Sequence, residues 1–155
     1  MNMRKCESGF TMVEVLVALV VLTIGLLGIA ALLLSSLQSG RTAIYRTQAV
    51  NLTADLADRI RANRLGQAAY GTLFADAEVE VAACFTTGGC TEGDLASSDL
   101  ARWKAMLAQL LPNGQGQVVV ALPVAAGEPT NYVVTVQWAE SGEVAPVTYA
   151  IGFAS

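Results

Sequence analysis

The sequence contains no histidine, and this absence removes the commonest general base near neutral pH and the commonest metal ligand. It also lacks a nucleophile paired with a base, a glycine-rich phosphate loop and a cluster of metal-ligating residues. Nine basic residues stand against thirteen acidic ones, and no basic block follows the first few residues. We therefore expect no enzymatic activity, no cofactor, no metal and no nucleic-acid partner.

Charged side chains are also missing from a long stretch near the N-terminus. Between Val15 and Leu34 the only polar side chain is that of Thr23. As an α-helix this stretch would measure about 30 Å, the hydrocarbon thickness of a bilayer. Because Arg4 and Lys5 precede the run, the positive-inside rule predicts a cytoplasmic N-terminus. In a bacterium the rest of the chain would then be periplasmic, anchored in the inner membrane by a single span.

A secretory signal peptide is the alternative for this N-terminus, since such signals also place a charged segment before an apolar run. The apolar run here is longer than in ordinary signals, and no A-x-A cleavage site occurs before Ser35. The pattern therefore favours a membrane anchor that stays with the mature protein.

The residues that open the apolar run form a recognisable motif, which reads Gly9-Phe10-Thr11-Met12-Val13-Glu14. It resembles the class III leader of type IV pilins and pseudopilins, although Met12-Val13 stands where Leu-Ile is usual. The resemblance implies that prepilin peptidase cuts between Gly9 and Phe10 and methylates the new amino terminus of Phe10. Cys6 would be lost with the leader.

Glu14 is the one carboxylate at the membrane end of this run. Placing an ionised carboxylate in hydrocarbon costs about 2.5 to 3.5 kcal/mol at a helix centre and less near an end, so a cationic partner is expected. The nearest cation is the amine that cleavage would create on Phe10. We hypothesise that Glu14 of one subunit pairs with this amine of another during assembly.

Gly25 and Gly28 interrupt the apolar run. They permit close helix packing or local melting, but glycine is also simply frequent in membrane helices, and the sequence leaves both readings open. Many major pilins carry a proline in this region, whereas this chain has none before Pro112. Any unwinding of the helix during assembly would therefore rely on the glycines.

Beyond Leu37 the apolar pattern becomes amphipathic, and the apolar residues follow at spacings of 4, 3, 4 and 4: Tyr45, Ala49, Leu52, Leu56 and Ile60. This spacing predicts a helix with one buried face that continues from about Thr11 to Arg64. We divide the chain into a leader (residues 1–9), a transmembrane or filament-core half of the helix (10–37) and a periplasmic head (38–155). The pairs Asp55–Arg59 and Asp58–Arg61 are read as a solvated helix face.

Two cysteines, Cys84 and Cys90, enclose five residues in the head. In an oxidising periplasm two nearby cysteines are expected to form a disulfide. A zinc site is the competing reading, but two thiolates without histidine or a second cysteine pair make a poor zinc shell.

The remaining elements predict an α+β fold. Residues 65–83 read as a loop with one short strand at 78–82. A capping box at Thr91 begins a second helix, which carries Leu100, Trp103, Leu107 and Leu110 on one face and ends near Leu111. Three strands follow, at 117–122, 132–138 and 147–153. We expect the long first helix to lie against this small antiparallel sheet, with one extra helix.

Several segments of the chain, one in the apolar run and three in the head, resemble the type IV pilus modification protein family, PilV: Ala18–Gly28, Asp99–Trp103, Leu111–Gly116 and Tyr132–Trp138. The resemblance covers nearly the whole chain. It implies a minor pilin of the type IV pilus that acts in pilus assembly, in a priming or tip complex with other minor pilins and the major pilin. A type II secretion pseudopilin would share the leader and the fold, and a DNA-uptake or adhesion pilin is a further alternative.

Overall fold

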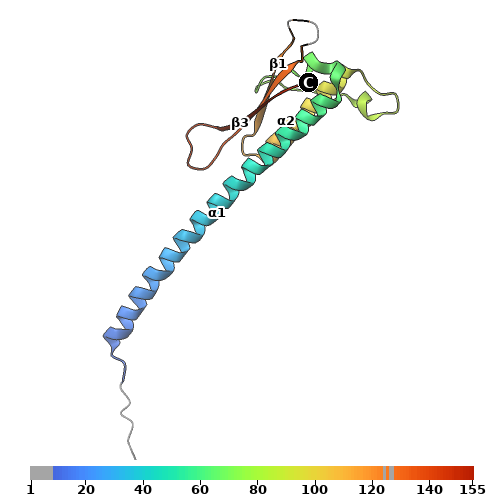
Figure 1. Cartoon of the computed structure of the whole chain (residues 1–155). Helices are drawn as coiled ribbons and strands as arrows, with labels where there is room; N and C mark the ends of the chain where they lie inside the picture. Colours follow the sequence, from blue (N-terminus) through green and yellow to red (C-terminus); the bar gives the residue numbers. More distant parts are fainter. Residues whose placement is uncertain (1–8, 124, 126–127) are drawn as a thin grey trace, which may run out of the picture. The chain divides into compact units, whose positions relative to one another are not determined.

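The computed structural model describes residues 9–123, 125 and 128–155. The elements in chain order are α1 (Met12–Ala62), the 3-10 helices η1 (Arg64–Tyr70) and η2 (Ala82–Phe85), α2 (Glu92–Leu110), and strands β1 (Gln115–Ala121), β2 (Asn131–Trp138) and β3 (Val147–Ala154) (Figure 1). The chain divides into two compact units, residues 1–41 and 42–155. In the second unit the C-terminal half of α1 packs on a three-stranded antiparallel sheet. The predicted α+β fold, with its extra helix, is therefore confirmed.

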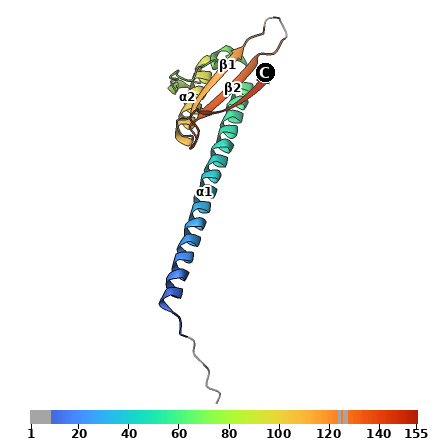
Figure 2. The same cartoon turned by 90° about the vertical axis from the view of Figure 1, so that its left-hand side faces the viewer.

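The sheet has the order β1-β2-β3, with both pairs antiparallel (Figure 2). Apolar side chains alternate along β2 and β3, and the two apolar rows meet across the strands, where Tyr132 pairs with Phe153 and Val136 with Tyr149. Both rows therefore lie on the same face of the sheet. The rings of Tyr132 and Phe153 stack with their centroids 5.2 Å apart.

The core lies between this face of the sheet and the two helices. The predicted helix face is confirmed, since Ala49, Leu52, Leu56 and Ile60 are buried and Tyr45 packs beside them. Trp103 of α2 is fully buried, and its indole Nε1 donates a hydrogen bond to the backbone oxygen of Leu52 at 3.0 Å. The indole therefore joins α2 to α1 through a polar contact inside an apolar core.

α2 begins and ends close to where the sequence predicts. The Thr91 hydroxyl accepts a hydrogen bond from the Asp94 backbone nitrogen, which confirms the cap at this end. At the other end the prediction was wrong in detail, because Leu110 is exposed and Leu111 fills the core instead. The helix stops at Leu110, and the extended backbone of Leu111 turns its side chain inward.

The segment between the helices differs from the predicted loop and strand. Residues 78–81 form no strand, and η2 begins at Ala82. The backbone nitrogen of Val81 donates instead to the Ser98 hydroxyl at 2.9 Å, so the segment is tied to α2 rather than to the sheet. The prediction also missed η1, whose last residue, Tyr70, is fully buried.

One close approach in the core requires glycine. A Cβ atom on Gly116 of β1 would overlap the indole ring of Trp103 and the side chain of Leu107. We expect Gly116→Ala to lower the free energy of unfolding by about 1 to 3 kcal/mol, because an overpacked core must shift to make room. Denaturant unfolding of the full chain in detergent, followed by near-ultraviolet circular dichroism, measures this change.

Gly152→Ala provides the matched control on the same sheet. A Cβ at Gly152 would meet only the Tyr132 backbone oxygen at 3.8 Å, which is ordinary van der Waals contact. This variant should unfold like the wild type. Equal stability of the two variants would contradict the assigned close contact.

Candidate functional site: processing junction, apolar helix and head clasp

The predicted processing junction lies in open backbone. Gly9 and Phe10 precede the first turn of α1 without regular structure, and Phe10 is 81% exposed. A Cβ atom on Gly9 would meet no atom within 4 Å, so packing in the described part of the chain does not require glycine here. The leader upstream, including Cys6, lies outside the described residues. The geometry leaves the Gly9–Phe10 bond accessible to a peptidase.

Glu14 lies in the first turn of α1, where the helix is capped by Thr11. The backbone nitrogen of Glu14 donates to both the backbone oxygen of Thr11, at 3.1 Å, and the Thr11 hydroxyl, at 3.3 Å. Thr11 thus satisfies backbone donors that an uncapped helix leaves open, and the Glu14 carboxylate lies near the positive end of the helix dipole. The sequence signal for this arrangement is the capping box Thr-x-x-Glu, which our sequence analysis did not use.

The apolar run forms a continuous helix whose side chains face outward. An 18-residue window in α1 has a mean hydropathy of 2.9, and none of it is buried within the structure. The Thr23 hydroxyl donates to the backbone oxygen of Val20 at 2.8 Å, so the one polar side chain between Val15 and Leu34 is satisfied inside its own helix. A helix of this length and composition can span a membrane. Gly25 and Gly28 are helical, and a Cβ on either would meet nothing within 4 Å.

In the head, a group of polar side chains clasps α1 to α2 and η1. Arg59 of α1 donates to Asp55 on its own helix and to Asp99 of α2, each at 2.9 Å. The hydroxyl of Tyr70 donates to the second oxygen of Asp99 at 2.9 Å. The prediction that Arg59 lies on a solvated helix face was wrong, because its guanidinium reaches Asp99 on another helix.

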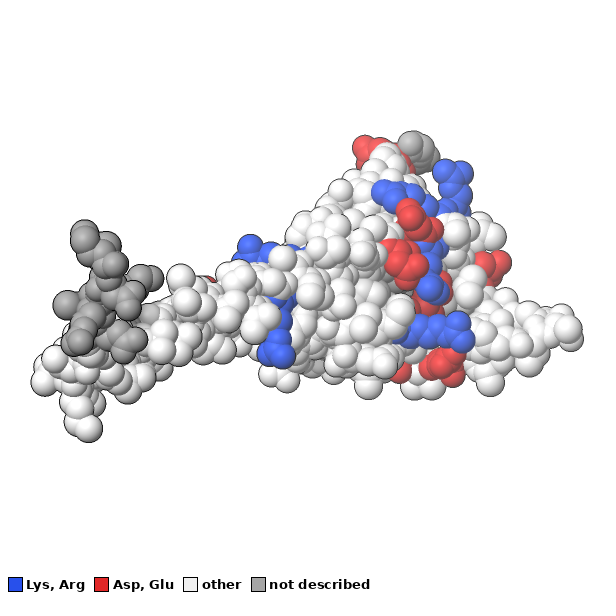
Figure 3. Space-filling view, turned by 90° about the horizontal axis from the view of Figure 1, so that it is seen from below, with Lys and Arg blue, Asp and Glu red and all other residues white. Residues whose placement is uncertain are grey.

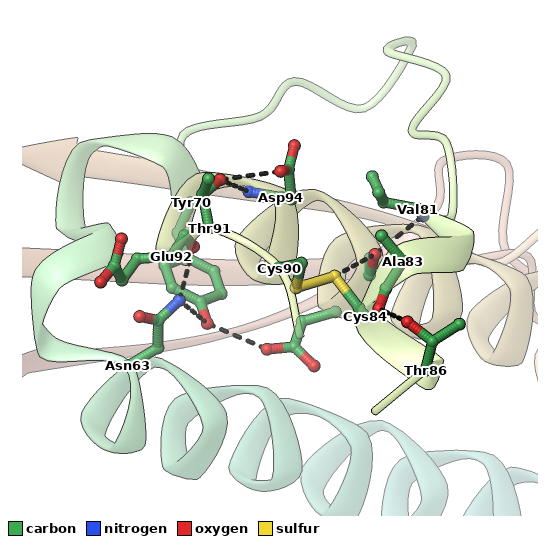
Figure 4. The surroundings of a disulfide bond; sticks show 12 residues. Asn63, Tyr70, Val81, Ala83, Cys84, Thr86, Cys90, Thr91, Glu92 and Asp94 are labelled. Atoms are coloured by element: carbon green, nitrogen blue, oxygen red, sulfur yellow. Dashed lines mark hydrogen bonds between the residues drawn. A yellow bond between two sulfur atoms is a disulfide. The ribbon is translucent and has the colours of Figure 1, made fainter. Parts of the chain in front are cut away.

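Asn63 completes the clasp where α1 ends. Its side-chain nitrogen donates to the Tyr70 hydroxyl at 3.2 Å and to the backbone oxygen of Glu92 at 2.8 Å (Figure 4). Burial raises the pKa of Tyr70 above its ordinary value, so this hydroxyl stays protonated and can donate to Asp99. The clasp therefore fixes three elements through buried hydrogen bonds. We name Arg59, Asn63, Tyr70 and Asp99 the head clasp.

The predicted disulfide between Cys84 and Cys90 is present and lies beside α2 (Figure 4). The hydroxyl of Ser98, which is buried in α2, contacts the Cys84 sulfur at 3.7 Å and accepts the hydrogen bond from Val81. The Ser98 hydroxyl thus links α2 both to the disulfide and to the segment just before it. In the described part of the chain, no group of three Cys, Asp or Glu residues is placed to hold a metal ion.

Two basic side chains of α2 are occupied within the head. Lys104 Nζ donates to the Thr72 hydroxyl and to the backbone oxygens of Leu73 and Asp76, at 2.7 to 2.8 Å. Burial lowers the pKa of this lysine. Arg102 pairs with Glu80 at 2.7 Å and stacks on the Phe85 ring, 3.9 Å from its centroid. On the face drawn in Figure 3, basic and acidic side chains are interspersed across the head.

Comparisons with known proteins agree with the N-terminal motif and with the first part of the head. Residues 4–30 match the model of the prokaryotic N-terminal methylation motif, and residues 31–101 match the model described as type IV pilin Tt1218. The second match covers the end of the apolar run, the rest of α1, the clasp and the first half of α2. No curated protein and no solved structure matches the chain. Together the two adjoining matches support a type IV pilin, and the methylation motif implies processing by prepilin peptidase.

The head clasp can be tested by removing its charge. Asp99→Asn keeps the shape of the side chain but leaves Arg59 without its interhelical counter-ion. We expect the free energy of unfolding to fall by about 1 to 3 kcal/mol, since Asp99 is mostly buried and accepts two hydrogen bonds. Asp58→Asn is the control, because it removes an exposed pair with Arg61 and should cost less than about 0.5 kcal/mol. Denaturant unfolding measures the free energy of unfolding of the two variants. Equal losses of stability would show that Asp99 contributes no more than an exposed ion pair does.

The disulfide gives a second prediction for stability. Closing the short loop between Cys84 and Cys90 should stabilise the head by about 2 kcal/mol on the chain-entropy model. The double variant C84S/C90S should therefore unfold at lower denaturant, and a reducing agent should shift the wild type but not the variant. Non-reducing mass spectrometry of the wild type checks the bond itself. Free thiols at both positions would contradict the pairing.

Proposed function

We propose that this chain is a minor pilin of the type IV pilus, of the PilV kind, which acts in pilus assembly. Prepilin peptidase would remove residues 1–9 on the cytoplasmic side of the inner membrane and methylate Phe10. The chain would then remain in the membrane by the apolar half of α1, with residues 38–155 as a periplasmic head. It would next join other minor pilins in a complex that primes or caps the pilus.

The observation that carries this proposal is the position of Glu14. It lies in the first turn of an exposed apolar helix that has no other charged side chain before Arg41. The predicted cleavage site places a new amine four residues earlier, at Phe10. Glu14 is at the N-terminal end of the helix, and its carboxylate forms no ion pair with another residue that the structure describes. A cation from another subunit would therefore meet this carboxylate in an apolar setting. Pairing between subunits would neutralise both charges and set the register of neighbouring helices.

The polar clasp and the disulfide support a structural role for the head. The clasp joins α1, η1 and α2 through hydrogen bonds and an ion pair, and the disulfide closes the loop before α2. Beyond Arg64 the only basic residues are Arg102 and Lys104, and both are engaged within the head. These contacts weigh against DNA capture by the head. Partners are therefore expected to be other pilins.

A type II secretion pseudopilin remains the second candidate, because it would have the same leader and the same arrangement of helix and sheet. Deletion of the encoding gene separates the two functions. Loss of pili and twitching with intact protein secretion supports the type IV pilus assignment. Loss of secretion with intact pili overturns it in favour of the pseudopilin.

Glu14 stands at the third position of the capping-box pattern Thr-x-x-Glu and also carries a charge, and variants can separate these two properties. Glu14→Gln keeps a residue that suits the third position of a capping box but removes the charge. We expect normal insertion and normal cleavage, with incorporation into pili reduced at least about tenfold. Immunoblots of sheared pili and of membranes measure incorporation and processing in the same cells.

Thr11→Ala is the matched control for this experiment. It removes the side-chain cap of α1 and leaves the Glu14 charge in place, at a cost of about 1 kcal/mol in helix stability. If charge pairing drives assembly, Thr11→Ala is incorporated into pili far better than Glu14→Gln. Equal incorporation of Glu14→Gln and wild type would refute the pairing.

A further inference from the structure

The segment between η1 and η2 has little regular structure of its own. Residues 73–81 lie within the described part of the chain and form neither a helix nor a strand, and Thr72 makes a single antiparallel bridge to Val118 of β1. The two residues exchange backbone hydrogen bonds of 2.9 and 3.0 Å. Thr72 thus covers part of the outer edge of β1, where a free strand edge would expose backbone donors and acceptors.

The ammonium group of Lys104, on α2, lies among the oxygens of this segment. Its Nζ donates to the Thr72 hydroxyl at 2.7 Å and to the backbone oxygens of Leu73 and Asp76 at 2.7 and 2.8 Å. An ammonium has three N–H donors and no acceptor, so these three oxygens take up all of its donors. A neutral amine would offer fewer donors to the same oxygens. The geometry therefore suits the charged form of the lysine.

The oxygens are also held by contacts that do not involve the lysine. The Thr72 hydroxyl donates to Glu78 Oε1 at 2.6 Å, and this carboxylate oxygen lies 3.9 Å from Lys104 Nζ. The Asp76 carboxylate accepts a hydrogen bond from the Leu73 backbone nitrogen at 2.7 Å, which closes the turn between them. Burial lowers the pKa of Lys104, whereas the charges of Glu78 and Asp76 act in the opposite direction. The two carboxylates thus offset part of the cost of burying the ammonium.

We propose that residues 72–78 form a cation-binding cage for a primary ammonium group, and that Lys104 occupies it as a ligand built into the chain. We name the oxygens of Thr72, Leu73, Asp76 and Glu78 the ammonium cage. The bound ammonium holds the segment against α2 and so keeps Thr72 on the edge of β1. The cage lies wholly in the head, so it does not depend on whether the chain serves a pilus or a secretion system.

The donor set explains why the ligand is a primary ammonium. A hard divalent cation such as Ca²⁺ takes about six to eight oxygen ligands, with carboxylates in direct contact. In the cage the three nearest oxygens are uncharged, and the carboxylate of Glu78 lies behind the Thr72 hydroxyl. A quaternary ammonium would carry the charge but could not donate to any of these oxygens.

The first test removes the ammonium and keeps most of the side-chain stem. In Lys104→Met we expect the backbone amides of Thr72 and Val118 to exchange with solvent at least about tenfold faster, as for the loss of one hydrogen bond to a charged group. Hydrogen exchange of the full chain in detergent measures this. Arg102→Met is the matched control, because it removes a cation of the same helix whose pair, with Glu80, lies outside the cage. It should leave both amides unchanged.

The second test refills the cage from solution. Lys104→Ala removes the atoms that correspond to a propylammonium ion, so propylammonium chloride should slow exchange at Thr72 and Val118 in this variant as its concentration rises. It should have no effect on Arg102→Met. Tetramethylammonium chloride at the same ionic strength is the matched probe, since it has the charge without N–H donors, and it should not slow exchange.

The wild type gives a reading that needs no variant. Lys104 in the folded chain should react with an amine-acylating reagent at least about tenfold more slowly than in the chain unfolded with guanidinium chloride, because its hydrogen bonds must open first. Peptide mass spectrometry measures the modification at this residue, and this test holds even where a variant fails to fold.

Three results would overturn the cage. The first is equal acylation of Lys104 in the folded and unfolded chain. The second is exchange at Thr72 and Val118 that is the same in Lys104→Met as in the wild type or in Arg102→Met. The third is failure of propylammonium to slow exchange in Lys104→Ala, or equal slowing by tetramethylammonium, because the lysine would then act through its stem or through charge alone.

Discussion

The head depends on the contact that Trp103 makes with three elements at once. Its indole is fully buried in α2, its Nε1 donates to the backbone oxygen of Leu52 in α1, and its ring lies directly against Gly116 of β1. The ring therefore sets the spacing between helix α1, helix α2 and the sheet. A buried indole N–H is costly to leave without an acceptor, and that of Trp103 donates to a backbone oxygen of α1. Replacing the ring would leave both a cavity and an open approach to β1.

The head clasp fixes the relative orientation of the elements that meet around this apolar contact. Hydrophobic packing alone permits a helix to rotate or slide on a sheet with little loss, because apolar contact is not directional. The hydrogen bonds from Arg59 and Tyr70 to the two oxygens of Asp99 have defined distances and angles, so they fix how α1, η1 and α2 meet. Cys84 and Ser98 extend the same restraint to the loop before α2. The core thus packs α1, η1 and α2 together, and the clasp fixes their relative orientation.

Elements with a clear period were predictable from the sequence. The 4-3-4-4 spacing of apolar residues predicted the buried face of α1, and alternation in the last forty residues predicted three strands close to their observed bounds. The Thr91 cap was predictable because it depends only on residues three apart. The prediction of a strand at 78–82 was wrong, because a strand needs a neighbouring strand to pair with. Local composition does not show which edge of the sheet is free to provide one.

The head clasp was not predictable for a related reason. Asp99 meets Arg59 forty residues away and Tyr70 twenty-nine residues away, and neither separation leaves a periodic trace in the sequence. Arg59 also forms the local pair with Asp55 that the sequence suggests, and this local pair conceals the distant one. At the N-terminus the opposite holds, since the Thr11 cap could be read from four consecutive residues. Thr11 supplies the cap, and Glu14, three residues later, supplies the charge.

Packing within the described residues explains the glycine at Gly116 and does not explain those of α1. At Gly25, Gly28 and Gly40 an added Cβ would meet no atom within 4 Å, whereas at Gly116 it would strike the core. Alanine favours a helix by about 1 kcal/mol over glycine, and no contact among the described residues accounts for glycine at these three helical positions. Packing within the described part of the chain therefore explains why glycine stands at position 116, where a Cβ would overlap the core, and gives no reason for the glycines of α1.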